Sequence, residues 1–461
     1  MTTRKSAEVV VIGGGPGGYV AATRAAQLGM DVVLIERDRI GGTCLNRGCV
    51  PIIYLQRQAR LFSRMKDAGR WGIRAKPSLD FGSMMKGKDE VVDDIVRAMN
   101  VTLRKEGVKL IEGEASFLEP GSIEVSKRAG DKETIEYEKA IIATGCRPDT
   151  ERLEASKDNV ITTDEALELR EVPKSIAVIG GDSISTSLAS IFMELGSQVI
   201  LLVEEEHILP DEDGEIAVYL QETLKSRGLK IFTETQVEAV SSINGTRKVS
   251  LLTSPSRSEI AAEKVLLCHR TPLIGGLGLD RINVKTKQGI LVNDKMETTE
   301  PGVYAVGDVL GRHALAHVAL AEGMVAAENA AEEEKTMDYR IISQSVHSIP
   351  ELAGVGLTEK QAKDQGYRVK VSTFPFSQNT LAKTVGETEG LIKAVADRES
   401  GEVLGVHMVG LDVSNLVAEC ALAIKLEATI EDIAQLIHVH PSKAEAVRDV
   451  FWKMYRALHY K

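Results

Sequence analysis

The stretch Ala7–Arg37, "AEVVVIGGGPGGYVAATRAAQLGMDVVLIER", decides the fold of this chain. It contains an apolar strand, a glycine-rich turn, a helix with one apolar face, and a second apolar strand that ends at Glu36. The glycines have the spacing Gly-x-Gly-x-x-Gly and stand directly between the strand and the helix. This order of elements predicts a βαβ unit that binds a dinucleotide.

The three glycines of the turn have separate roles. Gly13 makes the tight turn, Gly15 lets a pyrophosphate approach the backbone, and Gly18 lets the helix pack closely on the strand. The N-terminus of the helix then attracts the phosphates, and Glu36 can bind ribose hydroxyls. A glycine-rich turn without a ligand is the alternative, and the full strand–turn–helix–strand context disfavours it.

A second copy of the unit follows from Ser175 to Glu205, as "SIAVIGGDSISTSLASIFMELGSQVILLVEE". Between the copies, "SIEVSKRAGDKETIEYEKAIIATG" predicts a polar hairpin that leads into a buried strand. The polar run Ala331–Arg340 is a predicted linker, beyond which alternating strand patterns are followed by helices from Ser414 onward. The chain therefore has two dinucleotide-type units and a third, different region.

Composition limits the classes of function. A length of 461 residues is enough for about three domains of roughly 100–200 residues each. The formal net charge of −11 argues against nucleic-acid binding, because no basic stripe is available for phosphates. The apolar run near the N-terminus is too short for a signal peptide or a membrane span, so we expect a cytoplasmic protein that does not bind membranes.

Two of the five cysteines, Cys44 and Cys49, lie close together in "GGTCLNRGCVPIIYL" (Gly41–Leu55). The five cysteines are too scattered for the disulfide framework of a small secreted domain, so this close pair is a candidate for catalysis or metal binding. A zinc site needs four ligands, and the sequence offers no second Cys/His cluster, so we expect no metal. Two incidental buried cysteines remain the alternative.

A candidate base for these thiols occurs far along the chain, in "HVHPSKAE". His440 is followed by Glu445, which suits a histidine that exchanges protons and a carboxylate that orients it. The alternatives are a packed or surface histidine, or a metal ligand together with His438.

Taken together, these features resemble the flavoprotein disulfide reductases, class I of the pyridine nucleotide-disulfide oxidoreductases, and among them the dihydrolipoamide dehydrogenase branch. The resemblance covers essentially the whole chain. It rests on motifs that occur in the order of that family: "GGTCLNRGC.P", "IIATGCRP", "TTEPGVYAVGDV", "LAHVALAEG", "IPELAGVGLTEKQAK" and "HVHPSKAE".

The resemblance implies an α/β fold with two Rossmann-like dinucleotide-binding domains and a C-terminal α+β dimerisation domain. The FAD-binding domain would comprise residues 1–150 and 276–335. A degenerate NAD-binding-like domain would comprise residues 151–275, and the interface domain residues 340–461.

It also implies an FAD held by the first glycine loop and Glu36. The further cofactor-binding residues that the resemblance implies are Gly42, Thr43, Thr144, Gly145, Asp308 and Ala316.

For catalysis, the resemblance implies that Cys44 exchanges with a substrate disulfide and that Cys49 lies against the flavin. His440, oriented by Glu445, would carry the proton. In this family the histidine reaches the thiols of the other subunit, so a homodimer is implied. The substrate would be a dithiol or disulfide, such as a lipoyl group on a carrier protein. Thiolates are the reactive form, which fits a base beside the pair.

The second dinucleotide-type unit departs from the family pattern. Asp182 and Ser185 stand where an intact copy has glycines. Two unit charges about 4 Å apart repel by roughly 4 kcal/mol at an effective dielectric constant of about 20, which is nearly three orders of magnitude in affinity. Val203 replaces the acid that would hold the adenosine ribose, unless the register shifts so that Glu204 takes its place.

Three further positions also depart from the family pattern, and they too indicate weaker binding of NAD(H). His269 replaces the glycine of a "GRxP" turn, where a ring would crowd a dinucleotide. The family pairs a lysine near the flavin with a glutamate of the second unit, and here those positions hold Ile53 and Ser187. Losing both charges is tolerable, whereas losing one would leave a buried charge without compensation.

We therefore predict an FAD-dependent dithiol/disulfide oxidoreductase for which NAD(H) use is doubtful. Its electron partner would be another redox protein, a quinone or oxygen. Two alternatives stay open: an NAD-dependent dihydrolipoyl dehydrogenase that tolerates the changes, and a non-catalytic flavoprotein paralogue that acts as an assembly subunit.

Overall fold

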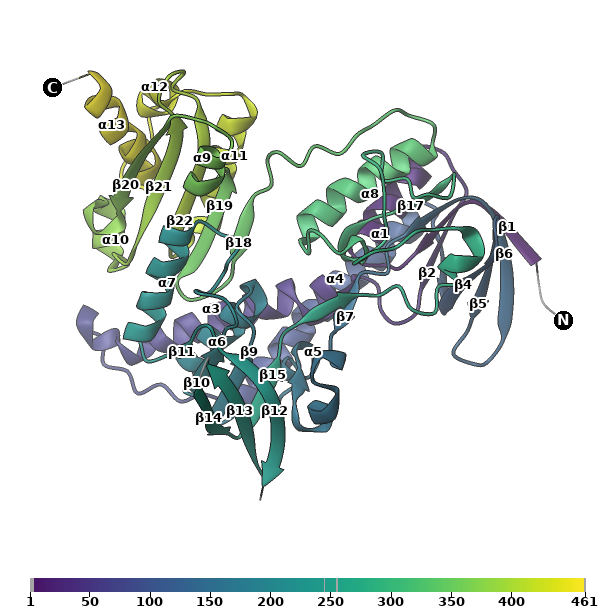
Figure 1. Ribbon diagram of the computed structural model, residues 1–461, viewed down its shortest axis with the longest axis horizontal. Coiled ribbons are helices and arrows are strands. Elements are labelled where there is room, and N and C mark those ends of the chain that lie inside the picture. The colour runs from purple at the N-terminus through teal and green to yellow at the C-terminus, as the bar shows by residue number, and fades with distance from the viewer. Residues whose placement is uncertain (1–3, 244, 254–255, 460–461) are drawn as a thin grey trace. The chain divides into compact units, whose positions relative to one another are not determined.

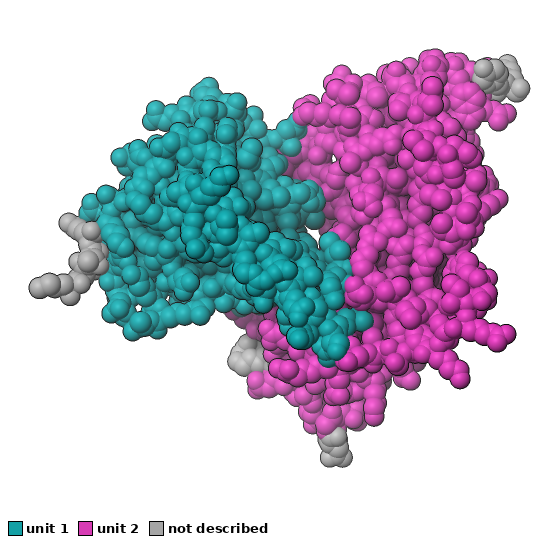
Figure 2. All heavy atoms as spheres, turned by 180° about the vertical axis from the view of Figure 1, so that it is seen from behind, with its two compact units in different colours: residues 1–54, 82–149, 269–338 teal, residues 55–81, 150–268, 339–461 magenta. Residues whose placement is uncertain are grey.

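Figure 1 shows the computed structural model, which describes residues 4–243, 245–253 and 256–459. The chain forms two compact units (Figure 2). Unit 1 comprises residues 1–54, 82–149 and 269–338, and unit 2 comprises residues 55–81, 150–268 and 339–461. The expected division into three domains, with its boundaries, stays a prediction.

Unit 1 is built on a seven-stranded sheet of order β3-β2-β1-β6-β5-β4, with β17 paired to β6. Strands β1, β2, β3, β6 and β17 pair in parallel, and the β4–β5–β6 edge is antiparallel. The strands are β1 (Arg4–Ile12), β2 (Val32–Glu36), β3 (Lys109–Glu112), β4 (Glu114–Glu119), β5 (Ser122–Ser126), β6 (Lys132–Ile142) and β17 (Val303–Ala305). The predicted hairpin and the buried strand after it are β5 and β6.

Two helices of unit 1, α1 (Pro16–Gln27) and α8 (Ala316–Ala330), pack against each other (Figure 1). Their backbones approach so closely that a Cβ added at Gly323 would lie 2.4 Å from the carbonyl oxygen of Gly17. The remaining elements are α2 (Gly42–Arg47), α3 (Cys49–Lys66), η1 (Ala68–Trp71), α4 (Phe81–Lys105), β7 (Cys146–Pro148), β16 (Arg270–Pro272), η3 (Leu279–Ile282) and η4 (Gly307–Leu310). Of these, η1, part of α3 and the first residue of α4 lie in unit 2.

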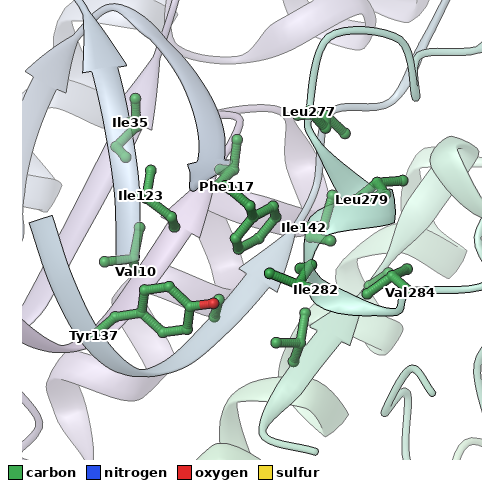
Figure 3. Close-up of a cluster of buried hydrophobic side chains, with 14 of the residues drawn as sticks. Val10, Ile35, Phe117, Ile123, Tyr137, Ile142, Leu277, Leu279, Ile282 and Val284 are labelled. Carbon is green, nitrogen blue, oxygen red and sulfur yellow. The ribbon is translucent and has the colours of Figure 1, made fainter. Parts of the chain in front are cut away.

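The core of unit 1 joins segments that are far apart in the sequence (Figure 3). Phe117 is fully buried and packs edge-on against Tyr137, with ring centroids 5.9 Å apart. Leu277 and Ile282, from a later segment, belong to the same cluster. Burying such side chains stabilises a fold by roughly 1.5–3 kcal/mol each. The late segment is therefore held on the N-terminal sheet.

Unit 2 contains the second copy of the βαβ pattern in a parallel sheet of order β11-β10-β9-β15-β8. A three-stranded antiparallel sheet, β12–β13–β14, accompanies it. The elements are η2 (Glu151–Asn159), β8 (Ile161–Thr162), α5 (Thr163–Ala166), β9 (Ser175–Ile179), α6 (Ser183–Leu195), β10 (Gln198–Leu202), α7 (Gly214–Ser226), β11 (Lys230–Phe232), β12 (Gln236–Ile243), β13 (Thr246–Thr253), β14 (Ser256–Ala262) and β15 (Lys264–Leu267).

The C-terminal part of unit 2 is an antiparallel sheet of order β18-β19-β22-β21-β20, and α13 lies along β20 and β21 (Figure 1). Its elements are β18 (Gln344–Val346), β19 (Glu351–Gly356), α9 (Glu359–Asp364), β20 (Val369–Pro375), η5 (Phe376–Gln378), α10 (Thr380–Val385), β21 (Gly390–Asp397), β22 (Val403–Gly410), η6 (Val413–Asn415), α11 (Val417–Lys425), α12 (Ile430–Ala434) and α13 (Glu445–His459). The predicted α/β class, with a different C-terminal region, is confirmed. Across the described residues, we find no helix with the length and apolarity that a membrane span requires.

A buried lysine ties α7 to this C-terminal sheet inside unit 2. Lys393 on β21 is 2% exposed, and its Nζ lies 3.0 Å from Asp213, 3.0 Å from Glu215 and 2.9 Å from Glu359. Burial alone would lower the pKa of Lys393, but hydrogen bonds to Glu359 and Glu215 raise it above its ordinary value. The ammonium group therefore compensates three carboxylates at once.

Replacing this lysine should weaken unit 2 strongly. We expect Lys393→Met to destabilise it by about 3–5 kcal/mol, because the carboxylates around Asp213 lose their buried counter-charge. Urea unfolding followed by circular dichroism measures the change. The control is Lys360→Met, whose lysine pairs with Asp364 at the surface and is 85% exposed there, so the expected change is within about 0.5 kcal/mol. Equal shifts of the urea midpoint in the two variants would contradict the stabilising role of Lys393.

Candidate active site

The site begins where three parallel strands of unit 1 end together. The last residues of β1, β6 and β17 are in register with one another. Gly13 follows β1, Thr144 follows β6, and Asp308 lies in the turn that follows β17. The carboxyl ends of parallel strands are where α/β sheets bind ligands. Three of the predicted cofactor-binding residues therefore share one edge of the sheet.

The first glycine loop leaves the N-terminus of α1 open. Gly13 has a φ of +102°, and a Cβ added at Gly18 would lie 1.9 Å from the carbonyl oxygen of Gly13, so both positions require glycine. Gly15 is the N-cap of α1 and supplies no side-chain hydrogen bond. The first backbone N–H groups of the helix are therefore available to an anion.

Glu36 lies against this loop. Its Oε2 accepts a hydrogen bond from the N–H of Gly14 at 2.6 Å, and its Oε1 accepts one from the N–H of Asp38 at 2.8 Å. These contacts hold the carboxylate at the end of β2, which is the position from which the acid of a βαβ unit reaches a ribose.

The thiol-bearing segment is attached directly to the glycine loop. The N–H of Gly41 donates to the carbonyl of Gly14 at 2.7 Å, and Gly41 has a φ of +99°. A Cβ at Gly41 would lie 2.3 Å from the Leu45 side chain, so the turn into α2 requires glycine. Cys44 lies on α2 and Cys49 is the first residue of α3. The two cysteines are therefore presented by two consecutive helices that start beside the loop.

The two thiols act on each other. Both are half-buried, and the Cys44 thiol donates a hydrogen bond to Cys49. That bond lowers the pKa of Cys49, and it raises the pKa of Cys44 well above its usual range, with burial and the charge of Asp308 adding to the increase. The start of α3 also favours a thiolate at Cys49. Cys44 consequently needs a base, whereas Cys49 is the better leaving group.

Two residues that the sequence analysis missed connect the thiol segment with Asp308. Arg270 reaches Thr43 Oγ1 at 3.4 Å and the sulfur of Cys146 at 3.2 Å, and the Cys146 thiol donates to Asp308 Oδ2 at 2.9 Å. Burial and the neighbouring Asp308 raise the pKa of Cys146 to about 12. The signal was present, because Cys146 directly follows the predicted Thr144-Gly145 and belongs to the quoted motif "IIATGCRP".

The other cofactor-binding residues predicted in unit 1 are placed as follows. Gly42 begins α2 and faces Gly15, whose Cα would lie 2.6 Å from a Cβ at Gly42. The Thr144 hydroxyl donates to the carbonyl of Leu273 at 2.8 Å, Gly145 has a φ of +71°, and Ala316 begins α8.

The predicted base is held by its carboxylate in unit 2. His440 Nδ1 lies 2.9 Å from Glu445 Oε1, and the imidazole side chain is 66% exposed. The N–H of Ser442 donates to the other oxygen of Glu445 at 2.9 Å, and this bond, followed by the one from His440, lowers the pKa of Glu445. With Nδ1 engaged, Nε2 is the nitrogen that can exchange a proton with a thiol.

A second histidine–carboxylate pair anchors the same loop. His438 Nε2 lies 2.8 Å from Glu419 Oε1 on α11, and the His438 side chain is only 6% exposed. His438 and His440 therefore bind different carboxylates. Among the described residues we find no group of three or more His, Cys, Asp or Glu that is arranged to hold a metal ion.

The second loop, in unit 2, has a different helix start. Asp182 is the N-cap of α6, and its Oδ1 accepts the backbone N–H of Ser185 at 2.8 Å and the Ser185 hydroxyl at 2.8 Å. The strand register places Val203, fully buried, at the position that Glu36 has in the first copy. Glu204 instead pairs with Arg152 at 2.7 Å. The second loop therefore differs from the first at the helix N-terminus and at the end of the following strand.

The structure also places the three other residues that depart from the family pattern. Ile53 lies half-buried on α3 in unit 1, and Ser187 is buried on α6 in unit 2, where its hydroxyl donates to the carbonyl of Ser183 at 2.6 Å. His269 follows β15, and its carbonyl accepts the N–H of Asp149 at 2.8 Å.

Comparison with known proteins shows the family of this chain. Residues 7–323 match the family model of the pyridine nucleotide-disulphide oxidoreductases, and residues 342–451 match the dimerisation domain of the same family. The chain belongs to this family. Pyridine nucleotide-disulphide oxidoreductases include the dihydrolipoyl dehydrogenase of Thermus scotoductus, which is 39% identical over 99% of both chains, and that of Bacillus subtilis, which is 36% identical over 95% of this chain and 96% of the relative.

Solved structures of the family have the same fold. LpdA from Mycobacterium tuberculosis matches with a TM-score of 0.89 at 24% identity, over 98% of this chain and 99% of the other. The Cu(II) complex of the HOCl-induced flavoprotein disulfide reductase RclA from Escherichia coli matches with a TM-score of 0.88 at 25% identity, over 97% and 99%. This chain is thus a flavoprotein disulfide oxidoreductase of the dihydrolipoyl dehydrogenase type.

The residues around the first loop fit the FAD that the family implies. The uncapped start of α1 would take the pyrophosphate, Glu36 the ribose, and the segment with Thr144 and Asp308 the remainder of the molecule. When bound, FAD supplies an acceptor for an electron pair that arrives through the neighbouring dithiol.

Charge removal at Glu445 should impair the proposed proton transfer by His440. Because the pKa of Glu445 is lowered, the carboxylate is charged at all pH values above that pKa and holds the imidazole through Nδ1. We expect Glu445→Gln to slow the reaction with dihydrolipoamide by about 100-fold. Glu419→Gln, which alters the neighbouring pair at His438, is the matched control and should react as the wild type does. Equal slowing in both variants would contradict the role of Glu445.

Proposed function

We propose that this protein transfers electrons between a dithiol/disulfide substrate, the Cys44–Cys49 pair and FAD, and that NAD(H) is not an efficient partner. One observation carries the proposal: the hydrogen-bonded thiols lie on a segment that is bonded through Gly41 to the open glycine loop. A redox-active pair is thereby attached to the part of unit 1 that fits FAD.

The order of thiol exchange follows from the two pKa directions. With the pair oxidised, one substrate thiolate attacks the sulfur of Cys44 and releases Cys49 as the thiolate, because the thiol with the lower pKa leaves faster. The second substrate thiolate then attacks the mixed disulfide and releases Cys44. The products are the substrate disulfide and the reduced pair. Of the two protons that the substrate thiols lose, His440 takes up one and the departing Cys44, whose pKa is raised, takes up the other.

The proposed substrate is a short dithiol such as dihydrolipoamide, free or attached to a carrier protein. Its support is the likeness over nearly the whole chain to proteins named dihydrolipoyl dehydrogenase. The electron partner on the other side would be a redox protein, a quinone or oxygen. An NAD-dependent enzyme of the ordinary type is the competing function, and the same likeness favours it.

Cys44 should be essential for the dithiol reaction and not for FAD binding. We expect anaerobic dihydrolipoamide to bleach the flavin absorbance of the wild-type protein within seconds, and Cys44→Ser to slow this by at least about 1000-fold, because serine is a far poorer nucleophile and leaving group. Cys420→Ala, which changes a fully buried thiol on α11, is the control and should react as the wild type does.

A flavin that stays oxidised in the wild-type protein with every dithiol tested would contradict the proposal. It would favour a non-catalytic flavoprotein.

We further propose a homodimer in which His440 serves the thiols of the partner subunit. The match to the family's dimerisation domain supports it. So does a group of exposed apolar side chains on and near α11, which a second copy would cover. They are Leu422 at 59%, Leu426 at 70%, Leu436 at 49%, Ile437 at 96% and Val439 at 79% exposed.

A mixed dimer tests the sharing of the site. One protomer would carry Cys44→Ser and the other His440→Gln, with two different affinity tags to isolate the heterodimer. If the histidine acts on the partner's thiols, one of the two sites is intact and the heterodimer should retain about half of the wild-type activity. Both homodimeric variants are the controls and should be inactive. An inactive heterodimer would mean that the two residues act within one chain.

A further inference from the structure

The two glycine-loop units of this chain can be compared position by position. In the first, Ile12 pairs with Ile35 and the strand ends at Glu36. In the second, Ile179 pairs with Leu202 and the next residue is Val203. The register is the same, so the first unit is an internal reference for what an open dinucleotide loop looks like in this protein.

The two helices differ in which group accepts hydrogen bonds from their first backbone N–H groups. In α1 the N-cap is Gly15, which has no side chain, so the helix start is open. In α6 the N-cap is Asp182, whose carboxylate accepts both the N–H and the hydroxyl of Ser185, each at 2.8 Å. The carboxylate is an anion that the chain itself places on the helix N-terminus, where a dinucleotide places its pyrophosphate.

The packing of helix on strand differs as well. At Gly18 a Cβ would lie 1.9 Å from the carbonyl oxygen of Gly13, whereas Ser185 carries a Cβ at the corresponding position. The two loops therefore cannot share one backbone path, and φ is +133° at Gly180 against +102° at Gly13. The second loop therefore has a different backbone conformation, which accommodates the side chain of Ser185.

The residues beside the two loops differ in one respect. At the point where a Cβ of Gly14 would be, the nearest atoms are Ile40 Cδ1 at 2.6 Å and Glu36 Oε2 at 3.2 Å. At the matching point of Gly181, they are Val203 Cγ1 at 2.7 Å and Glu205 Oε2 at 3.3 Å. A carboxylate oxygen therefore lies beside each loop, but in the second copy it comes from Glu205, while Val203 holds the position of Glu36 at the end of the strand.

We propose that Asp182 and Ser185 form an internal substitute for the dinucleotide pyrophosphate, so that with Val203 the chain closes its own second site to NAD(H) and NADP(H). This rests on the proposed function, in which the electron partner is not a nicotinamide. Asp182 both occupies the helix N-terminus and repels a phosphate, and Val203 removes the carboxylate that ends the strand in the first copy.

The test is to reopen the site. The triple variant Asp182→Gly, Ser185→Gly, Val203→Glu copies the first loop into the second. We expect NADH binding, measured by calorimetry on the FAD-loaded protein, to become at least about 100-fold tighter than in the wild type. Anaerobic flavin reduction by NADH should become saturable.

Two further variants distinguish the possible causes of a gain in NADH affinity. These causes are an emptied N-terminus of α6, the removal of the Asp182 charge, and a general loss of stability in unit 2. Asp182→Asn removes the charge but keeps a capping side chain, so its gain in NADH affinity should be smaller than that of the triple variant. Thr358→Gly removes the capping box of α9 elsewhere in unit 2 and should leave NADH binding unchanged. If Asp182→Asn gained as much as the triple variant, occupancy of the helix N-terminus would not be part of the exclusion.

Two other results would overturn the inference. One is micromolar NADH binding with fast flavin reduction in the wild-type protein. The other is a triple variant that holds FAD and reacts with dihydrolipoamide, yet gains no affinity for NADH. The reaction with dihydrolipoamide is measured on the same samples. If that reaction fails while the triple variant still gains affinity for NADH, the proposed function is contradicted and this inference stands.

Discussion

The close contact between Gly13 and Gly18 is the constraint on which unit 1 depends. No side chain fits at Gly18, because a Cβ would meet the carbonyl oxygen of Gly13 at 1.9 Å. With glycine there, α1 packs on β1 and directs its open N-terminus over the ends of the parallel strands. Gly41 then bonds to the same loop, which sets the thiol-bearing helices beside the cofactor position.

The second unit keeps the architecture of the first with a different helix start. Its strands have the register of the first unit, and its helix is buried. The cap supplied by Asp182 stabilises the helix start by about 1 kcal/mol, as side-chain caps do, so the fold gains from the residue that we propose closes the site. A helix N-terminus accepts any well-placed anion, including one from its own chain, so the fold does not require a bound dinucleotide here.

Several parts of the site were predictable because their signals are local. The first glycine loop, Glu36 and the pairing of His440 with Glu445 follow from short spacings in the sequence. The sequence motif pointed to Cys146 but not to its partners, since Cys146 is more than a hundred positions from both Arg270 and Asp308 and meets them only because β6, β7, β16 and β17 converge. The cluster around Lys393 was missed for the same reason.

The sequence by itself determined the two βαβ units, the thiol pair, the histidine with its carboxylate and the family likeness, because each is encoded by residues close together along the chain. Only the tertiary structure decided which side chains satisfy one another. It placed Val203 rather than Glu204 opposite the second loop, and it turned Asp182 from an unfavourable charge into a helix cap. Register and hydrogen-bond partners depend on the folded backbone, whereas periodicity and spacing do not.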